Sequence, residues 1–297
     1  MQMDVPVGII GLGLMGTALS ERLIDAKVPM IGFDIDAAGC ERLRAMGGMV
    51  ATSLRDLAGR SRMIIVAVYS GEQALALFGE IERGAGPAPP IVLCTTTCGP
   101  DEITRLALHA ARAGIGLVEA PISGTSAEVR AGSATALVAG DLDTIESVGA
   151  LLDILCPRSV HIGMVGDASR AKLAINLILQ NNRAALAEGI VLAERLGLDG
   201  RAFLAAARQS AAYSRVMDSK GEKMLTRDFR PQSYIAQTLK DAELILSEAG
   251  RLGLRLPVTA AQTDLLRVAI ELEGPDSDSA AVIEAIRRPA ATSEAGI

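Results

Sequence analysis

The sequence is poor in the side chains on which several kinds of site depend. Its 297 residues include two histidines, four cysteines, three tyrosines and no tryptophan. Among the cysteines, Cys94 and Cys98 stand close together, but their spacing is not that of a metal site and neither histidine is near them. We therefore expect no metal and no disulfide, and thiols that stay reduced, as in a cytoplasmic protein.

Long apolar runs and basic clusters are also missing. No uninterrupted apolar run reaches the roughly 18 residues that a transmembrane helix needs, and the first residues, MQMDVPVGII, lack the basic start of a signal peptide. The net charge is −6, and no basic run alternates with aromatic residues. We therefore expect neither a membrane nor a nucleic acid as a partner.

The composition is that of a globular protein. The first half of the chain alternates β-rich and helical segments. A strand, a helix and a second strand at this spacing form a βαβ unit, which favours a parallel sheet. The expected strands cover residues 5–11, 28–34, 62–69, 91–97, 115–121, 134–140 and 159–163.

From Ala168 onward the strand signal stops and helical patterns follow one another. We expect helices over residues 168–196, 199–209, 214–225, 232–252, 257–273 and 279–288. The predicted fold class is therefore α/β, with a doubly wound Rossmann-type sheet in a dinucleotide-binding domain over residues 1–164. An all-helical C-terminal domain follows over residues 165–297.

The segment GLGLMG at residues 11–16 matches the GxGxxG pattern of dinucleotide-binding loops. It follows a predicted strand and opens a predicted helix, as that pattern requires. Gly11 would form the tight turn, Gly13 would let the backbone approach the pyrophosphate, and Gly16 would allow close helix packing. The predicted cofactor-binding residues of this loop are Gly11, Leu12, Gly13, Leu14, Met15 and Gly16, with the phosphates at the helix N-terminus.

Asp34, at the end of the second predicted strand, indicates which dinucleotide is bound. A carboxylate there accepts hydrogen bonds from the adenine ribose hydroxyls and repels a 2′-phosphate. The next residues, Ile35 and Asp36, include no arginine that could hold such a phosphate. We therefore expect NAD as the cofactor, with NADP possible.

The sequence contains few candidates for the acid/base residue of a dehydrogenase. His109 in a helix and His161 in a late strand give little support to a His–carboxylate pair. None of the tyrosines has a lysine four residues later, as the Tyr–Lys pair of short-chain reductases requires. A lysine is left as the best acid/base candidate.

That lysine lies in RAKLAINLILQNN, residues 170–182. Lys172, Asn176 and Gln180 are four residues apart and so share one line on an otherwise apolar helix. A buried lysine is costly, but partial desolvation and a nearby cofactor lower its pKa towards neutrality, which suits proton transfer. Asn176 could orient Lys172 or the substrate oxygen, while the alternative is a Lys172 that simply extends to solvent.

Four stretches, in order along the chain, resemble the β-hydroxyacid dehydrogenase family, which contains 3-hydroxyisobutyrate dehydrogenase and tartronate semialdehyde reductase. The first resembles its cofactor signature, the second its substrate-binding segment, the third its catalytic-lysine segment and the fourth its late lysine segment. The four stretches are VGIIGLGLMGTALSERLI, VEAPISGTSAEVRAGSATALVAG, GDASRAKLAINLIL and TLKDAELILSEAG.

The resemblance implies roles for residues of both predicted domains. Lys172 would be the general acid/base and Asn176 its partner. The substrate carboxylate would be held by Ser123, Gly124 and the backbone amide of Thr125, and the cofactor would also be contacted by Thr97 and Lys240.

The reaction implied is reversible hydride transfer between the nicotinamide cofactor and a small 3-hydroxy acid or its semialdehyde. The active site is expected in the cleft between the two domains, the second of which would be of the 6-phosphogluconate dehydrogenase type. The apolar remainder of the Lys172 helix is expected to pack the domains together. Related proteins pair through their helical domains, so a homodimer or homotetramer is expected.

The chain also departs from the family pattern at several positions. Cys94 replaces a common Asp, Val68 and Tyr69 replace a Leu-Pro pair, Thr125 replaces a second glycine, and Ile175 replaces one of two asparagines. These departures favour a substrate unlike 3-hydroxyisobutyrate. The alternatives are a reductase of another carbonyl or imine and a non-catalytic nucleotide-binding homologue, although the retained lysine argues against the imine reductases and the second alternative.

Overall fold

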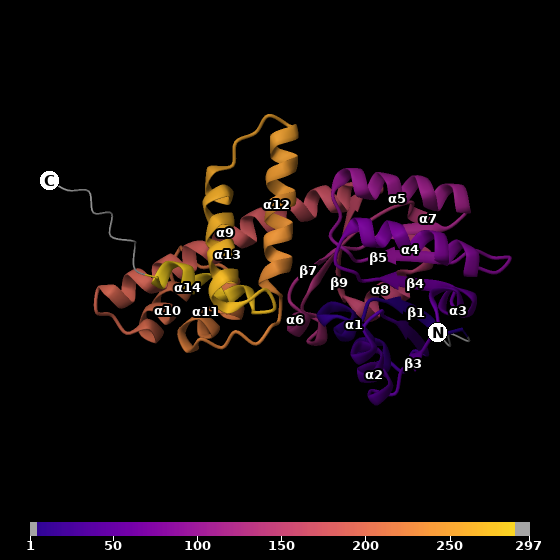
Figure 1. Cartoon of the computed structure of the whole chain (residues 1–297), viewed down its shortest axis with the longest axis horizontal. Helices are drawn as coiled ribbons and strands as arrows, with labels where there is room; N and C mark the ends of the chain where they lie inside the picture. Colours follow the sequence, from indigo (N-terminus) through magenta and orange to yellow (C-terminus); the bar gives the residue numbers. More distant parts are fainter. Residues whose placement is uncertain (1–4, 289–297) are drawn as a thin grey trace. The chain divides into compact units, whose positions relative to one another are not determined.

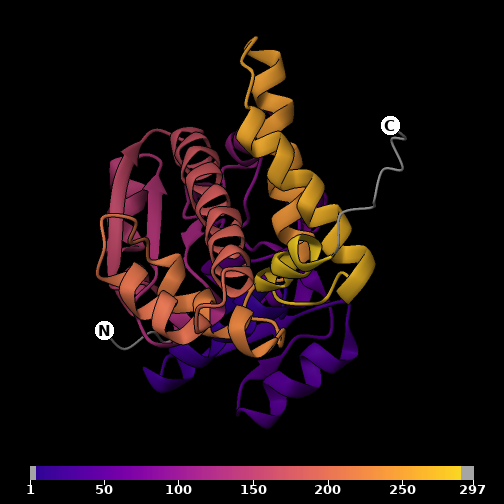
Figure 2. The ribbon, with the colours of Figure 1, turned by 90° about the vertical axis from the view of Figure 1, so that its left-hand side faces the viewer.

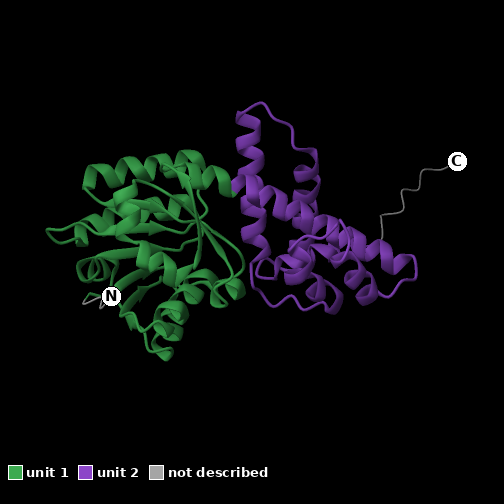
Figure 3. Cartoon of the chain, turned by 180° about the vertical axis from the view of Figure 1, so that it is seen from behind, with its two compact units in different colours: residues 1–172 green, residues 173–297 purple. Residues whose placement is uncertain are grey.

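The computed structural model describes residues 5–288, so the first four residues of the N-terminal segment lie outside it. The chain divides into two compact units between Lys172 and Leu173 (Figure 3). We call residues 1–172 the sheet unit and residues 173–297 the helical unit. The division falls inside one long helix, α9 (Asp167–Arg195), a few residues after the boundary predicted at 164/165.

The sheet unit is built on one sheet in the order β3-β2-β1-β4-β5-β6-β8-β7, with β9 paired to β8. From β3 to β6 all neighbours are parallel, which is the strand order of the Rossmann fold. The strands are β1 (Val7–Ile10), β2 (Met30–Phe33), β3 (Met49–Val50), β4 (Met63–Val66), β5 (Ile91–Cys94), β6 (Gly116–Glu119), β7 (Ile122–Ser123), β8 (Thr135–Ala139) and β9 (Arg158–Gly163).

All seven predicted strands are present, but the expectation of a parallel sheet is wrong at one edge. Strand β8 runs antiparallel to both β6 and β7. The connection from β7 to β8 holds one short helix, α6 (Ser126–Arg130), whereas parallel neighbours need a longer crossover. The two-residue strands β3 and β7 were not predicted, because they are too short to show a period.

Helices cover both faces of this sheet, so the side chains of each strand alternate between two apolar layers (Figure 1). In β4, Ile65 packs into one layer while Ile64 and Val66 pack into the other. The first layer contains residues of α1 (Leu14–Asp25), α2 (Ala37–Ala45), α6 and α8 (Gly149–Leu155), and the second contains residues of α3 (Leu54–Arg60), α4 (Gly71–Gly84) and α5 (Pro100–Ala113). Helix α7 (Leu142–Ser147) lies between β8 and α8 in the chain.

The helical unit contains the rest of α9 and the helices that follow it. Helices α12 and α13 lie side by side (Figure 2), and a core of buried aliphatic and methionine side chains joins the elements. Among residues 5–288, no helix combines the length and apolarity needed to cross a membrane. The elements are α10 (Gly200–Arg208), α11 (Val216–Thr226), α12 (Ile235–Arg251), α13 (Pro257–Glu273), a 3₁₀ turn (Ser279–Ala281) and α14 (Val282–Arg287).

Candidate active site

The loop between β1 and α1 has the geometry expected of a dinucleotide-binding loop. Gly11 has φ +93°, and a Cβ there would lie 2.3 Å from the carbonyl oxygen of Ala67. A Cβ on Gly16 would lie 1.8 Å from the carbonyl oxygen of Gly11, whereas a Cβ on Gly13 would meet nothing within 4 Å. Gly11 and Gly16 are therefore required because a side chain at either position would clash with the backbone. Gly13 has no such contact, so the space above it is open.

The helix that follows this loop has an N-terminus suited to an anion. Gly13 is the N-cap of α1, no side chain caps the first turn, and that turn contains no acidic residue. The backbone N–H groups of such a turn attract phosphate. The loop follows β1, which lies between β2 and β4, the point where the strand order reverses and where ligands of this fold bind.

Asp34 lies beside the loop, directly after β2. Its carboxylate accepts hydrogen bonds from the backbone N–H of Leu12 at 2.5 Å and from that of Asp36 at 2.9 Å. Arg42 of α2 donates to the carbonyl oxygen of Leu12 at 3.3 Å. The sequence analysis found no arginine directly after Asp34 and missed Arg42, because the turn of α2 that brings it back to the loop is not visible in the sequence.

Threonine side chains join the ends of β4 and β5. Thr96 Oγ1 accepts a hydrogen bond from the N–H of Val68 at 3.1 Å, and Thr97, the predicted cofactor contact, follows it and is half-buried. Of the two departures here, Tyr69 is 45% exposed, whereas Cys94 is 1% exposed and belongs to the sheet core. Tyr69 can therefore contact a ligand, and Cys94 cannot without rearrangement.

The predicted carboxylate-binding residues form a turn between β7 and α6. Gly124 has φ +151°, and a Cβ there would lie 2.8 Å from the Cβ of Ala134. Thr125 is the N-cap of α6: its Oγ1 accepts from the N–H of Glu128, and its own N–H donates to Glu128 Oε2 at 2.8 Å. The Thr125 amide is thus already bound in a capping box.

Lys172 lies next to this turn. Its Nζ donates to the carbonyl oxygen of Ile122 at 2.6 Å, and the residue is 6% exposed, so Lys172 is buried rather than extended to solvent. Ile122 directly precedes Ser123. The structure therefore brings Lys172 to the segment predicted to hold the substrate carboxylate.

In the helical unit, Asn176 and Gln180, which share one side of α9 with Lys172, are both buried. Asn176 Nδ2 donates to Asp241 Oδ2 at 2.9 Å, and Asp241 Oδ1 pairs with Lys240 Nζ at 2.9 Å. Gln180 donates to the carbonyl oxygen of Thr238. Asn176 and Lys240 therefore share a partner, Asp241, which the sequence analysis missed although it directly follows Lys240.

The apolar side of the same helix does not behave as expected. Ile178 is 59% exposed and Ala174 is also exposed, so the expectation that the apolar remainder packs the domains together is wrong for these two residues. The reason is that the polar side chains of the line have buried hydrogen-bond partners, which keeps their side of the helix inward.

The fold, the glycine loop and the buried lysine define an NAD(P)-binding oxidoreductase. Residues 6–163 match the family model of the NAD binding domain of 6-phosphogluconate dehydrogenase, and residues 166–286 match that of the NAD-binding domain of NADP-dependent 3-hydroxyisobutyrate dehydrogenase. Together these models cover nearly all of the described chain. The chain belongs to the β-hydroxyacid dehydrogenase family.

Several curated proteins are similar over nearly the whole chain. The 2-hydroxy-3-oxopropionate reductase of Escherichia coli (strain K12) is 29% identical over 284 residues, which are 94% of this chain and 96% of that protein. Glyoxylate/succinic semialdehyde reductase 1 of Arabidopsis thaliana is 28% identical over 95% of this chain and 98% of that protein. The cytokine-like nuclear factor N-PAC of Pongo abelii is 25% identical over 95% of this chain and 51% of that protein.

A solved structure confirms the fold. The 3-hydroxyisobutyrate dehydrogenase of Salmonella typhimurium has a TM-score of 0.86 at 24% identity, covering 95% of this chain and 99% of that one.

Proposed function

We propose that this protein transfers a hydride between a nicotinamide cofactor, NAD in preference, and a small 3-hydroxy acid or the matching semialdehyde. The observation that carries the proposal is the position of Lys172, a buried amine 2.6 Å from the backbone of Ile122. A buried amine beside a turn that offers a serine hydroxyl and a glycine amide can serve both proton transfer and carboxylate recognition.

The residues present fit the cofactor. The open space above Gly13 and the uncapped N-terminus of α1 suit a pyrophosphate, and Asp34 suits two ribose hydroxyls. When bound, the dinucleotide supplies the hydride acceptor or donor. Thr97 and Lys240 would hold it in addition to the loop residues Gly11, Leu12, Gly13, Leu14, Met15 and Gly16.

Lys172 would move the proton of the reaction. As a neutral amine it accepts the hydroxyl proton of the substrate alcohol, and as an ammonium it returns that proton to the carbonyl oxygen in the reverse direction. Ser123 Oγ and the Gly124 N–H would donate to the substrate carboxylate. The Thr125 amide could join them only if it left Glu128, and Asn176 would orient the substrate oxygen.

The test is cofactor reduction, followed by near-ultraviolet absorbance, with NAD and NADP against a panel of 3-hydroxy acids. We expect Lys172→Ala to lower turnover by about 10²–10⁴-fold, the usual share of a general acid/base. Lys172→Arg is the matched control, because it keeps a donor for the Ile122 carbonyl but cannot accept a proton. Turnover rescued by arginine would contradict the acid/base role.

The similarity to N-PAC, whose name designates a nuclear factor, supports a second candidate function, that of a non-catalytic nucleotide-binding protein. A non-catalytic nucleotide-binding protein would bind NADH without turning over any hydroxy acid, and Lys172→Ala would change nothing. A reductase of other carbonyls or of imines would instead show turnover when carbonyls are supplied with amines.

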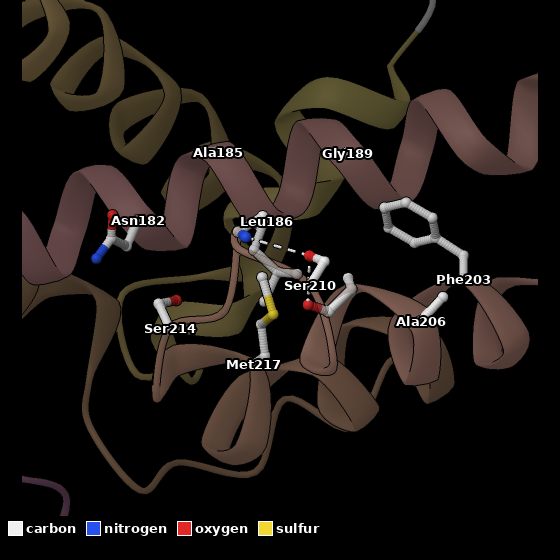
Figure 4. A pocket seen from close by; sticks show the side chains of 11 residues that line it. Asn182, Ala185, Leu186, Gly189, Phe203, Ala206, Ser210, Ser214 and Met217 are labelled. Atoms are coloured by element: carbon white, nitrogen blue, oxygen red, sulfur yellow. Dashed lines mark hydrogen bonds between the residues drawn. The ribbon is translucent and has the colours of Figure 1, made fainter.

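We also propose that the protein is a homodimer or homotetramer that pairs through its helical unit. Three aliphatic side chains of or next to α9, Ile178, Leu192 and Leu196, are each more than half exposed, as is common in self-association surfaces. Alongside lies a hollow of about 440 Å³ between α9 and α10, with Asn182 and Phe203 at opposite ends (Figure 4). Light scattering should show Leu192→Asp as a smaller species than the wild type.

A cytoplasmic location is part of the same proposal. It is supported by the four cysteines, which are all buried and form no disulfide within residues 5–288, as is usual where thiols stay reduced. An oxidising location would be indicated by their modification in the protein isolated from cells, measured by mass spectrometry.

A further inference from the structure

Glu119, at the end of β6, is a buried carboxylate whose partners are not cations. It is 1% exposed, and among residues 5–288 no cation lies within ion-pair distance of it. Its Oε1 accepts from the N–H of Gly166, and its Oε2 accepts from the N–H of Ser169 at 2.8 Å and from Ser169 Oγ at 3.0 Å. A buried charge of this kind needs such donors, because its desolvation is otherwise uncompensated.

Two of these donors belong to Ser169 in the first turn of α9, which begins at Asp167, and the third is the N–H of Gly166, the residue directly before the helix. The N-terminal N–H groups of a helix carry partial positive charge, so they stabilise a carboxylate held against them. Burial raises the pKa of Glu119, although these hydrogen bonds oppose the shift. Glu119 therefore anchors the first turn of α9 to the end of β6.

A second hydrogen bond, made by Lys172, joins the start of α9 to the residues that follow β6. Lys172 lies one turn after Ser169, and Ile122, whose carbonyl oxygen accepts from Lys172 Nζ, lies three residues after Glu119. Residues 119–122 and 166–172 are thus joined at both ends, by the Glu119 hydrogen bonds at one and by the Lys172 hydrogen bond at the other. The position of Lys172 Nζ beside Ser123 depends on where the first turn of α9 is held.

We propose that Glu119 is a positioning residue for the acid/base lysine: it fixes the first turn of α9 so that Lys172 reaches the Ile122–Ser123 segment. This inference rests on the proposed role of Lys172. Displacement of a catalytic group by about 1 Å costs up to roughly a hundredfold in rate, so loss of the anchor would lower kcat without removing any group that touches the substrate.

The test compares Glu119→Gln with Ser169→Ala in the full-length enzyme. The carboxamide is the same size as the carboxylate, but its NH₂ group must face one of the N–H donors, so at least one hydrogen bond is lost. Ser169→Ala removes the hydroxyl donor alone and leaves both backbone bonds. Measurements are kcat, KM, the pH profile of kcat and the dissociation constant of NADH.

We expect Glu119→Gln to lower kcat about tenfold to a hundredfold and Ser169→Ala to lower it far less, with NADH affinity unchanged in both. The pH profile of kcat should also change in Glu119→Gln, because the acid/base group is no longer held in the same place. A merely structural role predicts a lower melting temperature with kcat and the pH profile unmoved, and that result would overturn the proposal. If Glu119→Gln does not fold, Glu119→Asp takes its place, since it keeps the acceptor but is one methylene too short.

Hydrogen exchange separates this proposal from the proposed function. Amide protection over residues 166–172 should fall in Glu119→Gln and stay near the wild-type level in Ser169→Ala. If the wild-type enzyme turns over no hydroxy acid, the proposed function fails, and a loss of protection still supports the anchor. Unchanged protection would overturn the anchor whether or not the enzyme is active.

Discussion

The sheet unit and the helical unit satisfy their buried charges in different ways. In the sheet unit, Glu119 and Lys172 are bound by backbone groups and a serine hydroxyl. In the helical unit, Lys220 and Asp278 are bound to each other at 2.7 Å, and both side chains are almost completely buried. The sheet-unit charges need no opposite charge, whereas Lys220 depends on the side chain of Asp278, so the second arrangement should be more easily broken by one substitution.

Asp278 is the centre of the buried cluster in the helical unit. Its carboxylate also accepts from the N–H groups of Gln232 and Ala280. Burial works to raise the pKa of Asp278, but Lys220 and these donors outweigh it, and the pKa lies below its usual value. Burial lowers the pKa of Lys220 to about 8 and that of the nearby Arg183 to about 10. Asp278 opposes the effect of burial on both cations, and Asp241 opposes it on Arg183 as well.

The largest effect on stability should come from Asp278→Ala. Removing it leaves Lys220 without its ion-pair partner and Arg183 with Asp241 as its remaining attractive charge, and breaking a buried ion pair from one side costs about 3–5 kcal/mol. Lys220→Met should cost less, because Asp278 keeps its backbone donors. Urea unfolding followed by circular dichroism would compare them, and an equal or smaller loss in Asp278→Ala would show that Asp278 is not the centre of the cluster.

The Lys220 pKa gives the helical unit its own pH dependence. The folded-state pKa of about 8 lies below the ordinary 10.5, so the folded state releases this proton at lower pH than the unfolded state. The contribution of Lys220 to stability is therefore present above pH 10.5 and is lost as the pH falls through about 8. Unfolding free energies of the wild type and Lys220→Met at pH 7.5 and pH 10 would test this, since the difference should favour the wild type more at pH 10.

Substitutions of two glycines in the sheet unit should affect different properties: one should lower stability, and the other should lower cofactor affinity. Gly16→Ala places a methyl group 1.8 Å from a backbone oxygen, and overpacking of this kind costs about 1–3 kcal/mol. Gly13→Ala meets no protein atom within 4 Å, so its stability should match the wild type. Its NADH affinity should fall, because the methyl group fills the space left for the pyrophosphate. Wild-type affinity in Gly13→Ala, measured by NADH fluorescence, would move the pyrophosphate away from this loop.

The comparison of the two units also explains what the sequence could predict. Strands, helices and the glycine loop are local patterns, and their positions were predicted to within a few residues. The reversed direction of β8 depends on the length of a connection, and the bond from Asn176 to Asp241 joins residues 65 positions apart. Glu119 was not singled out because a lone glutamate ending a strand gives no local signal, and Ile178 was misplaced because apolar residues usually mark the buried side of a helix.

The smallest predicted effect on stability concerns one residue in each unit whose backbone has a positive φ angle. Lys27, just after α1, and Arg227, at the end of α11, have φ of +56° and +54°, where a side chain costs about 1–2 kcal/mol. Glycine removes that cost but loses about 0.5–1 kcal/mol of chain entropy, so Lys27→Gly should gain roughly 0.5–1 kcal/mol of stability. Arg227→Gly should gain less, because it also loses the ion pairs that the exposed Arg227 side chain makes to the partly buried Glu273 and the buried Glu284. Thermal unfolding at low and high salt would test the difference, which should shrink as salt screens the ion pairs; an equal gain at low salt would mean that those pairs add no stability.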